Sequence, residues 1–229
     1  MKNVLITGSS SGLGFSLSNI FKDNGYDVYR MSRSESSSAT HSLLLDFQNK
    51  QEIDSVLPDF IEDRNFDYLF LNAGTLGPIK KSKSITTTEV ENNFQVNVLA
   101  SKQILDYCIN NGNSIKNVIA ISSGASVTPY DGMFLYCLAK SAFRHLISCY
   151  ALENENIHFL SLAPGIIKTK MQDLLYTKDS SEFKTMKKFH DLYDNDGLAS
   201  ADEISKKIFN NLEFLNSLPS GNYYDLRDI

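Results

Sequence analysis

The sequence predicts an α/β fold in which a doubly wound parallel sheet of about seven strands carries helices on both faces. Three observations lead to this fold class. Short apolar runs alternate along the chain with segments whose apolar residues recur at helical spacing. Some runs are continuously apolar, such as Tyr-Leu-Phe-Leu at 68–71, which is typical of strands covered on both faces. Strand–helix alternation also favours parallel pairing through crossover helices.

The first elements show this alternation most clearly. Residues 4–7 form a short apolar run that ends in a Gly/Ser turn, and residues 13–21 repeat apolar side chains at helical spacing. Gly25 ends that helix, as a glycine after the last helical turn often does. Residues 27–32 read as the second strand, and a Ser-rich loop follows at 34–38.

The remaining elements continue the pattern to the end of the chain. A Thr-Thr-Thr-Glu run is typical of the start of a helix, and it precedes the longest helical stretch. In chain order we expect a strand at 42–45, a helix at 51–61, a strand at 68–71, a helix at 86–111, a strand at 118–121, a helix at 135–152, a strand at 157–162, a helix at 201–215 and a closing strand at 223–224.

No linker, repeat or change of composition divides the 229 residues, so we expect a single domain over 1–229. The segment 166–200 is the irregular part, rich in Lys and Asp with short helical pieces. In this class of fold, ligands bind beyond the carboxyl ends of the strands. We therefore interpret 166–200 as a substrate lid within the domain.

Composition excludes several classes of function. The chain has 22 Lys+Arg and 27 Asp+Glu, a net charge of −5 without blocks of like charge, so no nucleic-acid partner is expected. No apolar run of about 18 residues exists, so no membrane span is expected. The cysteines are odd in number and show no Cys-x-x-Cys, and the four histidines are scattered, which favours free thiols, a cytoplasmic location and no metal site. The cysteines are Cys108, Cys137 and Cys149.

A glycine-rich turn joins the first strand to the first helix. Residues 7–14 read Thr-Gly-Ser-Ser-Ser-Gly-Leu-Gly, and this strand–turn–helix context suits a pyrophosphate held by backbone N–H groups at a helix N-terminus. The spacing resembles the short-chain dehydrogenase/reductase family, whose members have a Rossmann fold. The predicted cofactor contacts in this turn are Gly8, Ser10, Ser11, Gly12, Leu13 and Gly14.

The end of the second predicted strand indicates which nicotinamide cofactor is used. NAD enzymes place an acid there for the ribose 2′-OH, whereas an arginine accommodates a 2′-phosphate. Here Ser32 replaces the acid and Arg33 follows it, so we predict NADP(H); a solvated loop arginine is the alternative. By the family resemblance, Asp46 and its neighbour Phe47 lie near the adenine.

Tyr136 and Lys140 are four residues apart on a predicted helix, which puts an ammonium group near a phenol. Such a pair alone is common, but family motifs accompany it. Ser123 ends the fifth predicted strand at the family's distance from the tyrosine, and its neighbour Ser122 should point the other way. The resemblance implies that Tyr136 is the general acid/base, that Lys140 lowers its pKa, that Ser123 orients the carbonyl and that Asn97 supports a proton relay.

Two further segments match the family. Asn72, Ala73 and Gly74 follow the fourth strand, although Leu71 replaces the first asparagine of the usual Asn-Asn-Ala-Gly. A Pro-Gly-x-x-x-Thr run follows the sixth strand. By resemblance these segments flank the ribose and the nicotinamide. The residues concerned in the second run are Pro164, Gly165, Ile167 and Thr169.

Local similarities over nearly the whole chain resemble one branch of the family, that of sepiapterin reductase and the bacterial benzil reductases. This resemblance implies a carbonyl reductase for a small ketone or vicinal dicarbonyl, with Met171 and Asp225 as candidate substrate contacts. An acid such as Asp225 could instead hold the guanidine-like edge of a pterin. An alcohol dehydrogenase acting on a sugar or pterin intermediate, and a non-catalytic NADP(H) sensor, remain as alternatives.

The resemblance also implies a homodimer or homotetramer. Family subunits pair through the helices that correspond to 88–111 and 134–152. The sequence suggests an apolar surface for this pairing, formed by Phe143, Leu146, Ile147 and Tyr150.

Overall fold

The computed structural model describes residues 2–35, 40–61, 64–112, 114–179, 181–195 and 197–229. The strands are β1 (Asn3–Thr7), β2 (Asp27–Ser32), β3 (His41–Leu44), β4 (Phe66–Leu71), β5 (Ile115–Ile121), β6 (His158–Ala163), β7 (Ile167–Lys168), β8 (Ala199–Ser200) and β9 (Tyr223–Asp225). The α-helices are α1 (Gly12–Asp23), α2 (Lys50–Ile61), α3 (Thr87–Phe94), α4 (Ala100–Asn110), α5 (Phe134–Glu153), α6 (Lys170–Tyr176), α7 (Lys184–Asp194), α8 (Ala201–Asn210) and α9 (Leu212–Ser217).

The main sheet has seven strands in the order β3-β2-β1-β4-β5-β6-β9, all paired in parallel. Strands β1 to β3 run outward to one edge, and the chain then returns to place β4 on the other side of β1. The switch point therefore lies between β1 and β4, where ligands bind in open parallel sheets. The predicted fold class, with its parallel sheet and flanking helices, is confirmed.

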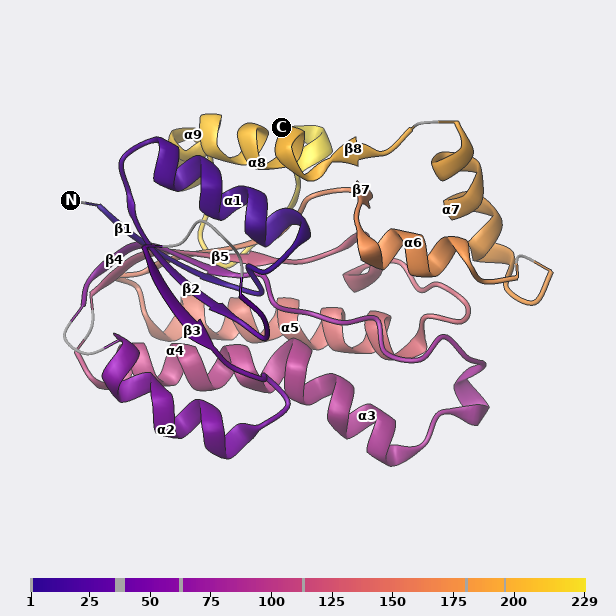
Figure 1. Ribbon diagram of the computed structural model, residues 1–229, viewed down its shortest axis with the longest axis horizontal. Coiled ribbons are helices and arrows are strands. Elements are labelled where there is room, and N and C mark those ends of the chain that lie inside the picture. The colour runs from indigo at the N-terminus through magenta and orange to yellow at the C-terminus, as the bar shows by residue number, and fades with distance from the viewer. Residues whose placement is uncertain (1, 36–39, 62–63, 113, 180, 196) are drawn as a thin grey trace.

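Helices cover both faces of the sheet (Figure 1). α1 and α8 lie side by side on one face, and α2, α4 and α5 cover the other. Each face has its own apolar core because successive strand residues point to opposite sides: Leu5 packs beneath α4 and α5, whereas Val4 and Ile6 pack against α1 and α8. α6 and α7 lie together beyond one end of the sheet (Figure 1).

The structure shifts several predicted boundaries. β3 begins one residue earlier than expected, because His41 stacks on Tyr29 with ring centroids 4.3 Å apart. The predicted helix at 201–215 is two helices, since the Asn211 side chain donates to the carbonyl of Lys207 (2.8 Å) and competes with the next helical turn. Gly25 follows the end of α1 in a left-handed conformation (φ 80°), as predicted.

Two longer segments also differ from the prediction. The predicted helix at 86–111 is one helical run that contains a π-helical segment, η2 (Gln95–Leu99), between α3 and α4. The segment 166–200 is more ordered than expected, since it contains α6, α7 and the small β7–β8 pair. The predicted Ser-rich loop at 34–38 lies partly outside the described residues.

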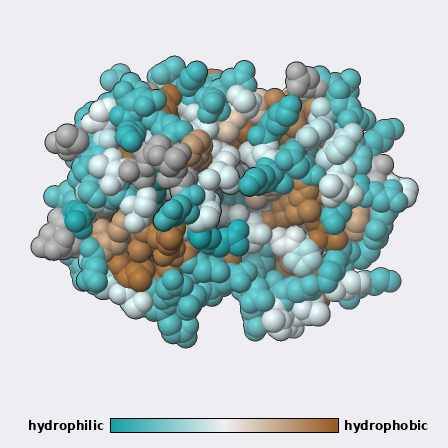
Figure 2. Space-filling view, in the orientation of Figure 1, coloured by the Kyte–Doolittle hydropathy of each residue, from teal (hydrophilic) through white to brown (hydrophobic). Residues whose placement is uncertain are grey.

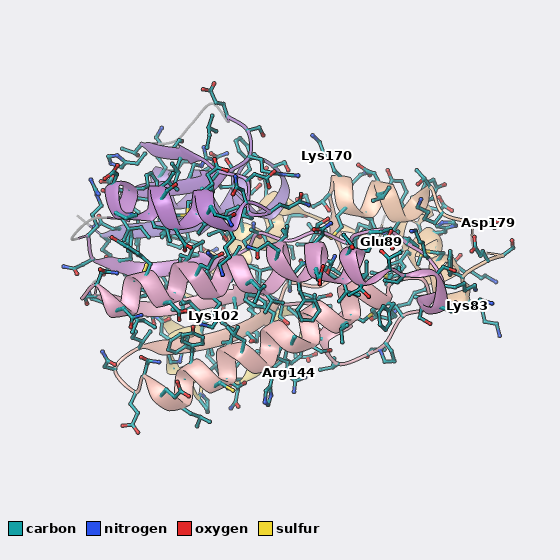
Figure 3. All side chains as sticks on the ribbon, turned by 90° about the horizontal axis from the view of Figure 1, so that it is seen from below. Lys83, Glu89, Lys102, Arg144, Lys170 and Asp179 are labelled. Carbon is teal, nitrogen blue, oxygen red and sulfur yellow. The ribbon has the colours of Figure 1, made fainter. Side chains whose placement is uncertain are left out.

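The prediction that Phe143 and Ile147 pair subunits is wrong because both are buried in the chain's own core, whereas Leu146 and Tyr150 are half-buried and their part in pairing stays a prediction. Phe143 and Ile147 are buried on the side of α5 that faces the sheet, and Leu146 and Tyr150 pack against the same core. The outer face of α4 and α5 is seen in Figure 3, where Lys102 and Arg144 are labelled. None of the helices in the described part of the chain is both long and apolar enough to cross a bilayer.

Candidate active site

The glycine turn is fastened to the end of β4. The Asn72 side chain donates to the carbonyls of Thr7 and Gly8 (both 3.0 Å), and the Thr7 hydroxyl accepts from the N–H groups of Asn72 (2.9 Å) and Ala73 (3.1 Å). Gly8 has φ 68°, and a Cβ there would lie 2.7 Å from the Cα of Ala73. Only glycine fits this approach, so the turn and the Asn72–Gly74 segment form one rigid unit.

The N-terminus of α1 is suited to a phosphate group. Its N-cap, Ser11, makes no side-chain capping bond, and the first turn of the helix has no acidic residue. The first N–H groups of α1 therefore carry their partial positive charge outward, without a carboxylate to compete for it. Gly12 has φ 56° and lies against Thr169, so the turn also meets the segment that follows β6. These residues fit a dinucleotide.

The predicted adenosine contacts lie at the carboxyl ends of β2 and β3. Ser32 is buried and donates to the carbonyl of Ser34 (2.9 Å), while Arg33 is exposed beyond it. Asp46 is exposed and Phe47 is part of the core. The sequence did not single out Arg30, which is 1% exposed with its guanidinium 5.3 Å from the centre of the Phe15 ring.

Tyr136 lies on α5 and faces the end of β5. The side chain of Ser123 lies beside its phenol, and the Ser123 hydroxyl accepts from the N–H of Ala125 (3.1 Å). Burial raises the pKa of Tyr136 to about 12, while Ser123 lowers it in part. Ser122 turns away, as predicted, and its hydroxyl donates to Ser126 (3.3 Å). The phenol is thus neutral near pH 7 and lies beside the serine side chain.

Lys140 lies one turn further along α5 and is 3% exposed. Its Nζ donates to the carbonyl of Ile121 (2.7 Å) and lies 5.8 Å from the centre of the Tyr136 ring. Burial lowers the pKa of Lys140 to about 8. The expected lowering of the Tyr136 pKa by Lys140 is therefore not observed in the protein by itself, because burial opposes the charged form of both groups.

Asn97 lies in η2 and is fully buried. Its side chain accepts from the N–H of Thr75 (3.0 Å) and donates to the carbonyl of Thr75 (3.0 Å) and to the carbonyl and side chain of Asn93 (2.9 and 3.0 Å). A Cβ at Gly74 would lie 2.9 Å from Asn97 Oδ1 and 3.6 Å from Lys140 Nζ. The two polar groups therefore converge at Gly74. The sequence did not reveal Asn93, although its spacing of four residues from Asn97 was visible.

The predicted substrate side is formed by the segment after β6 and by the C-terminus. Pro164 and Gly165 follow β6, Ile167 lies in β7, and Met171 in α6 packs against the apolar cluster that contains Tyr136. That cluster otherwise consists of Leu76, Ala125, Met133, Leu175, Phe183, Met186 and Phe189.

Asp225 lies at the carboxyl end of β9, opposite Ala163 of β6. Its carboxylate accepts two bonds from the Arg227 guanidinium, from Nε (2.8 Å) and Nη2 (2.6 Å). Arg227 lowers the pKa of Asp225 and in turn lies against Gly165. This carboxylate therefore already holds a guanidinium from its own chain.

The fold and this edge of the sheet define a dinucleotide-binding α/β protein. A family model for short chain dehydrogenase matches residues 2–180, so the chain belongs to that family and is an oxidoreductase acting on CH–OH or C=O groups. Members use a nicotinamide dinucleotide. The resemblance predicted from the glycine turn and the later motifs is confirmed.

Curated relatives agree with this family, and a solved structure agrees with the fold. Benzil reductase ((S)-benzoin forming) of Bacillus subtilis is 26% identical over 244 residues, covering 100% of this chain and 99% of that protein. Sepiapterin reductase of Rattus norvegicus is 29% identical over 167 residues, which are 70% of this chain and 63% of that protein. The KRED1-Pglu enzyme has a TM-score of 0.83 at 24% identity, covering 98% of this chain and 100% of its own. These relatives match the predicted branch.

Proposed function

We propose that this protein is an NADPH-dependent carbonyl reductase that transfers hydride to a small ketone or vicinal dicarbonyl, with Tyr136 as general acid/base. The observation that carries the proposal is the placement of Tyr136, Ser123 and Lys140 together at the end of β5, with Lys140 Nζ bound to the Ile121 carbonyl and 5.8 Å from the centre of the Tyr136 ring. A carbonyl placed there meets two hydroxyl groups at once.

The chain's residues supply the proton and the orientation. Because burial raises the pKa of Tyr136, its phenol remains protonated near neutral pH and is able to donate to the carbonyl oxygen. Ser123 holds the same oxygen, and the fixed pair limits the poses in which transfer occurs. NADPH, when bound, supplies the hydride to the carbonyl carbon. Tyr136 then takes a proton from the Lys140 ammonium, and Lys140 takes one from solvent. Asn97, which converges with Lys140 at Gly74, supports this relay without giving up a proton.

The surroundings of Tyr136 favour an apolar substrate. Leu175, Met186 and Phe189 of the predicted lid pack in the same cluster as Tyr136. Figure 2 shows hydrophobic surface below the place that α6 occupies in Figure 1. Asp225 is satisfied by Arg227, so a pterin would have to displace that guanidinium. These features favour an aromatic or aliphatic dicarbonyl over a pterin.

The preference for NADPH rests on the end of β2. Arg33 is exposed there, where its guanidinium is free to meet a 2′-phosphate, and Ser32 adds no repelling charge. An acid at Ser32 would instead select the unphosphorylated ribose.

We further propose a homodimer or homotetramer that pairs through the face shown in Figure 3. Leu99, Phe134 and Leu138 expose 39 to 42% of their surface along η2 and α5. Sedimentation equilibrium tests this: Leu138→Glu, at an exposed site, should shift the protein toward monomer while its circular dichroism spectrum stays that of the folded wild type. A wild-type monomer at all concentrations would contradict the proposal.

The direct test of function follows NADPH absorbance with benzil, 1-phenyl-1,2-propanedione and sepiapterin. Turnover of a dicarbonyl should fall by a factor of about 100 to 10,000 in Tyr136→Phe while NADPH binding persists. Ser123→Ala should also lose activity, and Ser122→Ala is the matched control because this neighbouring hydroxyl faces Ser126. Turnover of sepiapterin that appears only in Arg227→Ala would show that the Asp225–Arg227 pair selects against pterins.

Tight NADPH binding without turnover of any carbonyl would contradict the proposal and favour a sensor. Oxidation of alcohols or sugars in preference to reduction of dicarbonyls would favour the dehydrogenase alternative.

A further inference from the structure

The helix α7 of the predicted lid lacks an N-cap of its own. Its N-cap position is Phe183, whose side chain has no acceptor, and no acidic residue lies in its first turn. The first N–H groups of a helix need acceptors from outside the helix. Those of α7 must therefore find theirs elsewhere in the chain.

Asp131 supplies these acceptors from a loop 53 residues earlier in the sequence. Its Oδ2 accepts from the N–H of Lys184 (2.8 Å) and its Oδ1 from the N–H of Thr185 (2.9 Å). Although burial raises the pKa of Asp131, the bonds from Thr185 and Lys184 lower it overall, which fits a carboxylate at a helix N-terminus.

Close packing fixes the same junction. Gly132 has φ 78°, and a Cβ there would lie 2.8 Å from Cδ1 of Phe183. The Lys81 ammonium lies 4.6 Å from the centre of the Phe183 ring and donates to the carbonyl of Glu182 (2.6 Å). The start of α7 is thus held between the loop after β4 and the loop before α5.

This junction lies close to the proposed proton donor. Asp131 precedes α5 by three residues and Tyr136 by five. Phe183 and Met186 of α7 pack in the same apolar cluster as Tyr136. A shift of the α7 N-terminus therefore changes the wall that faces the substrate, without touching the cofactor contacts around the glycine turn.

We propose that Asp131 is a positioning residue that caps α7 from another part of the chain and so sets the lid against the catalytic helix α5. The effect on catalysis rests on the proposed reductase function. Its signature is a higher KM for the carbonyl substrate with little change in kcat or in NADPH affinity.

The experiment compares Asp131→Ala with Asp131→Asn. Asn has one acceptor oxygen where Asp131 uses two, and its NH2 group would face the second N–H, so Asp131→Asn should fall between wild type and Asp131→Ala. Loss of the cap in Asp131→Ala should raise the KM about fivefold to tenfold. Hydrogen exchange of a peptide over 183–187 should become faster by a similar factor. Asp67→Ala is the matched control, since Asp67 accepts from the N–H of Asn3 (2.9 Å) at the opposite end of the sheet.

A double-mutant cycle combines the loss of the acceptor, Asp131, with the loss of one donor, the N–H of Lys184. Lys184→Pro deletes one N–H at the first position of α7, where proline is tolerated, and Phe183 before it is already extended (φ −130°, ψ 109°). Its effect on KM and exchange should largely disappear in the Asp131→Ala background. Because Lys184→Pro leaves the 130–133 loop intact, it also decides the matter if Asp131→Ala does not fold.

Unchanged exchange over 183–187 in Asp131→Ala, equal effects from Asp67→Ala, or additive effects in the cycle would overturn the proposal. If the wild type reduces no carbonyl, the proposed function fails while the exchange data still decide whether Asp131 holds α7.

Discussion

The two sides of the candidate active site are held together by different kinds of contact. On the cofactor side, the Asn72 side chain binds the main-chain carbonyls of Thr7 and Gly8, and the Thr7 hydroxyl accepts from the main-chain N–H groups of Asn72 and Ala73. On the lid side, bonds to main-chain atoms are confined to the start of α7, held by Asp131, and to the Gln172 amide, which donates to the Phe189 carbonyl (3.5 Å). Elsewhere α6 and α7 meet through apolar side chains and two exposed pairs, Tyr176 with Asp194 (2.7 Å) and Tyr193 with Asp173 (3.1 Å).

This difference shows how one fold combines cofactor binding, which stays the same, with substrate binding, which varies. Bonds to main-chain atoms fix the backbone and leave little freedom for side-chain change. Contacts between exposed side chains contribute little each and tolerate rearrangement. We therefore expect the cofactor side to resist change and the lid side to adapt to the substrate.

The largest effect should come from a methyl group on the cofactor side. Gly8→Ala puts a Cβ 2.7 Å from the Ala73 Cα in a left-handed conformation, so we expect at least about 2 kcal/mol of lost stability and loss of NADPH binding. Gly197→Ala in the lid is the matched control, because its Cβ would lie 3.4 Å from Leu192. It should change stability by less than about 0.5 kcal/mol. Thermal denaturation and NADPH titration measure both, and equal losses would break the comparison.

A smaller loss of NADPH binding is expected from a change at Arg33, an exposed residue on the cofactor side. Arg33→Ala should weaken NADPH binding about tenfold to hundredfold, because charge-assisted bonds to a phosphate contribute about 1.5–3 kcal/mol. NADH binding should remain the same, which serves as the internal control. Equal weakening of both cofactors in fluorescence titrations would show that Arg33 does not contact the 2′-phosphate.

The smallest effect is a dependence on pH that comes from Lys140. Burial lowers its pKa from 10.5 to about 8, so its charge is lost as pH rises through 8. The kcat/KM for NADPH should then fall about tenfold per pH unit above 8. Between pH 8 and 9 the unfolded chain binds the proton that Lys140 of the folded chain has lost, so the free energy of unfolding should rise with pH. Above pH 9 buried Cys108, whose pKa is raised from 9.0 to about 12, opposes this rise.

Lys140→Met is the control for this pH dependence, because it removes the titrating group and should remove the rise in stability. A wild-type unfolding free energy that stays flat between pH 8 and 9 would mean that Lys140 keeps its proton when buried.

Most of the fold could be predicted from the sequence because its signals are local. Continuous apolar runs such as 68–71 mark buried strands, and the glycine turn marks the switch point. The failures have one local and one distant cause. Apolar spacing over 201–215 does not show that the Asn211 side chain reaches back four residues to the Lys207 carbonyl. Nothing near α7 in the sequence shows that Asp131, 53 residues earlier, caps it.

In the candidate site too, some features could be predicted from local spacing and others depend on the fold. Tyr136, Lys140 and Ser123 could be found because a helix and a strand end fix their relative positions. The spacing of Tyr136 and Lys140 does not show their burial, which raises the pKa of Tyr136 in the protein by itself. That Lys140 lowers this pKa during the reaction stays a prediction. Asp225 and Arg227 are only two residues apart, but the sequence does not show that they pair. The pairing depends on the fold, which places Arg227 against Gly165.

The π-helical segment η2 sets which residues of the helical run from α3 to α4 face the sheet and which face Thr75. A wider turn contains one residue more than the α-helical turn that it replaces. Deleting one residue within 95–99 should therefore restore a regular helix and keep α4 seated on the sheet. The same deletion would rotate Asn97 out of reach of Thr75. The extra residue of η2 is therefore needed to place Asn97 at the site, and it is not needed for α4 to pack on the sheet.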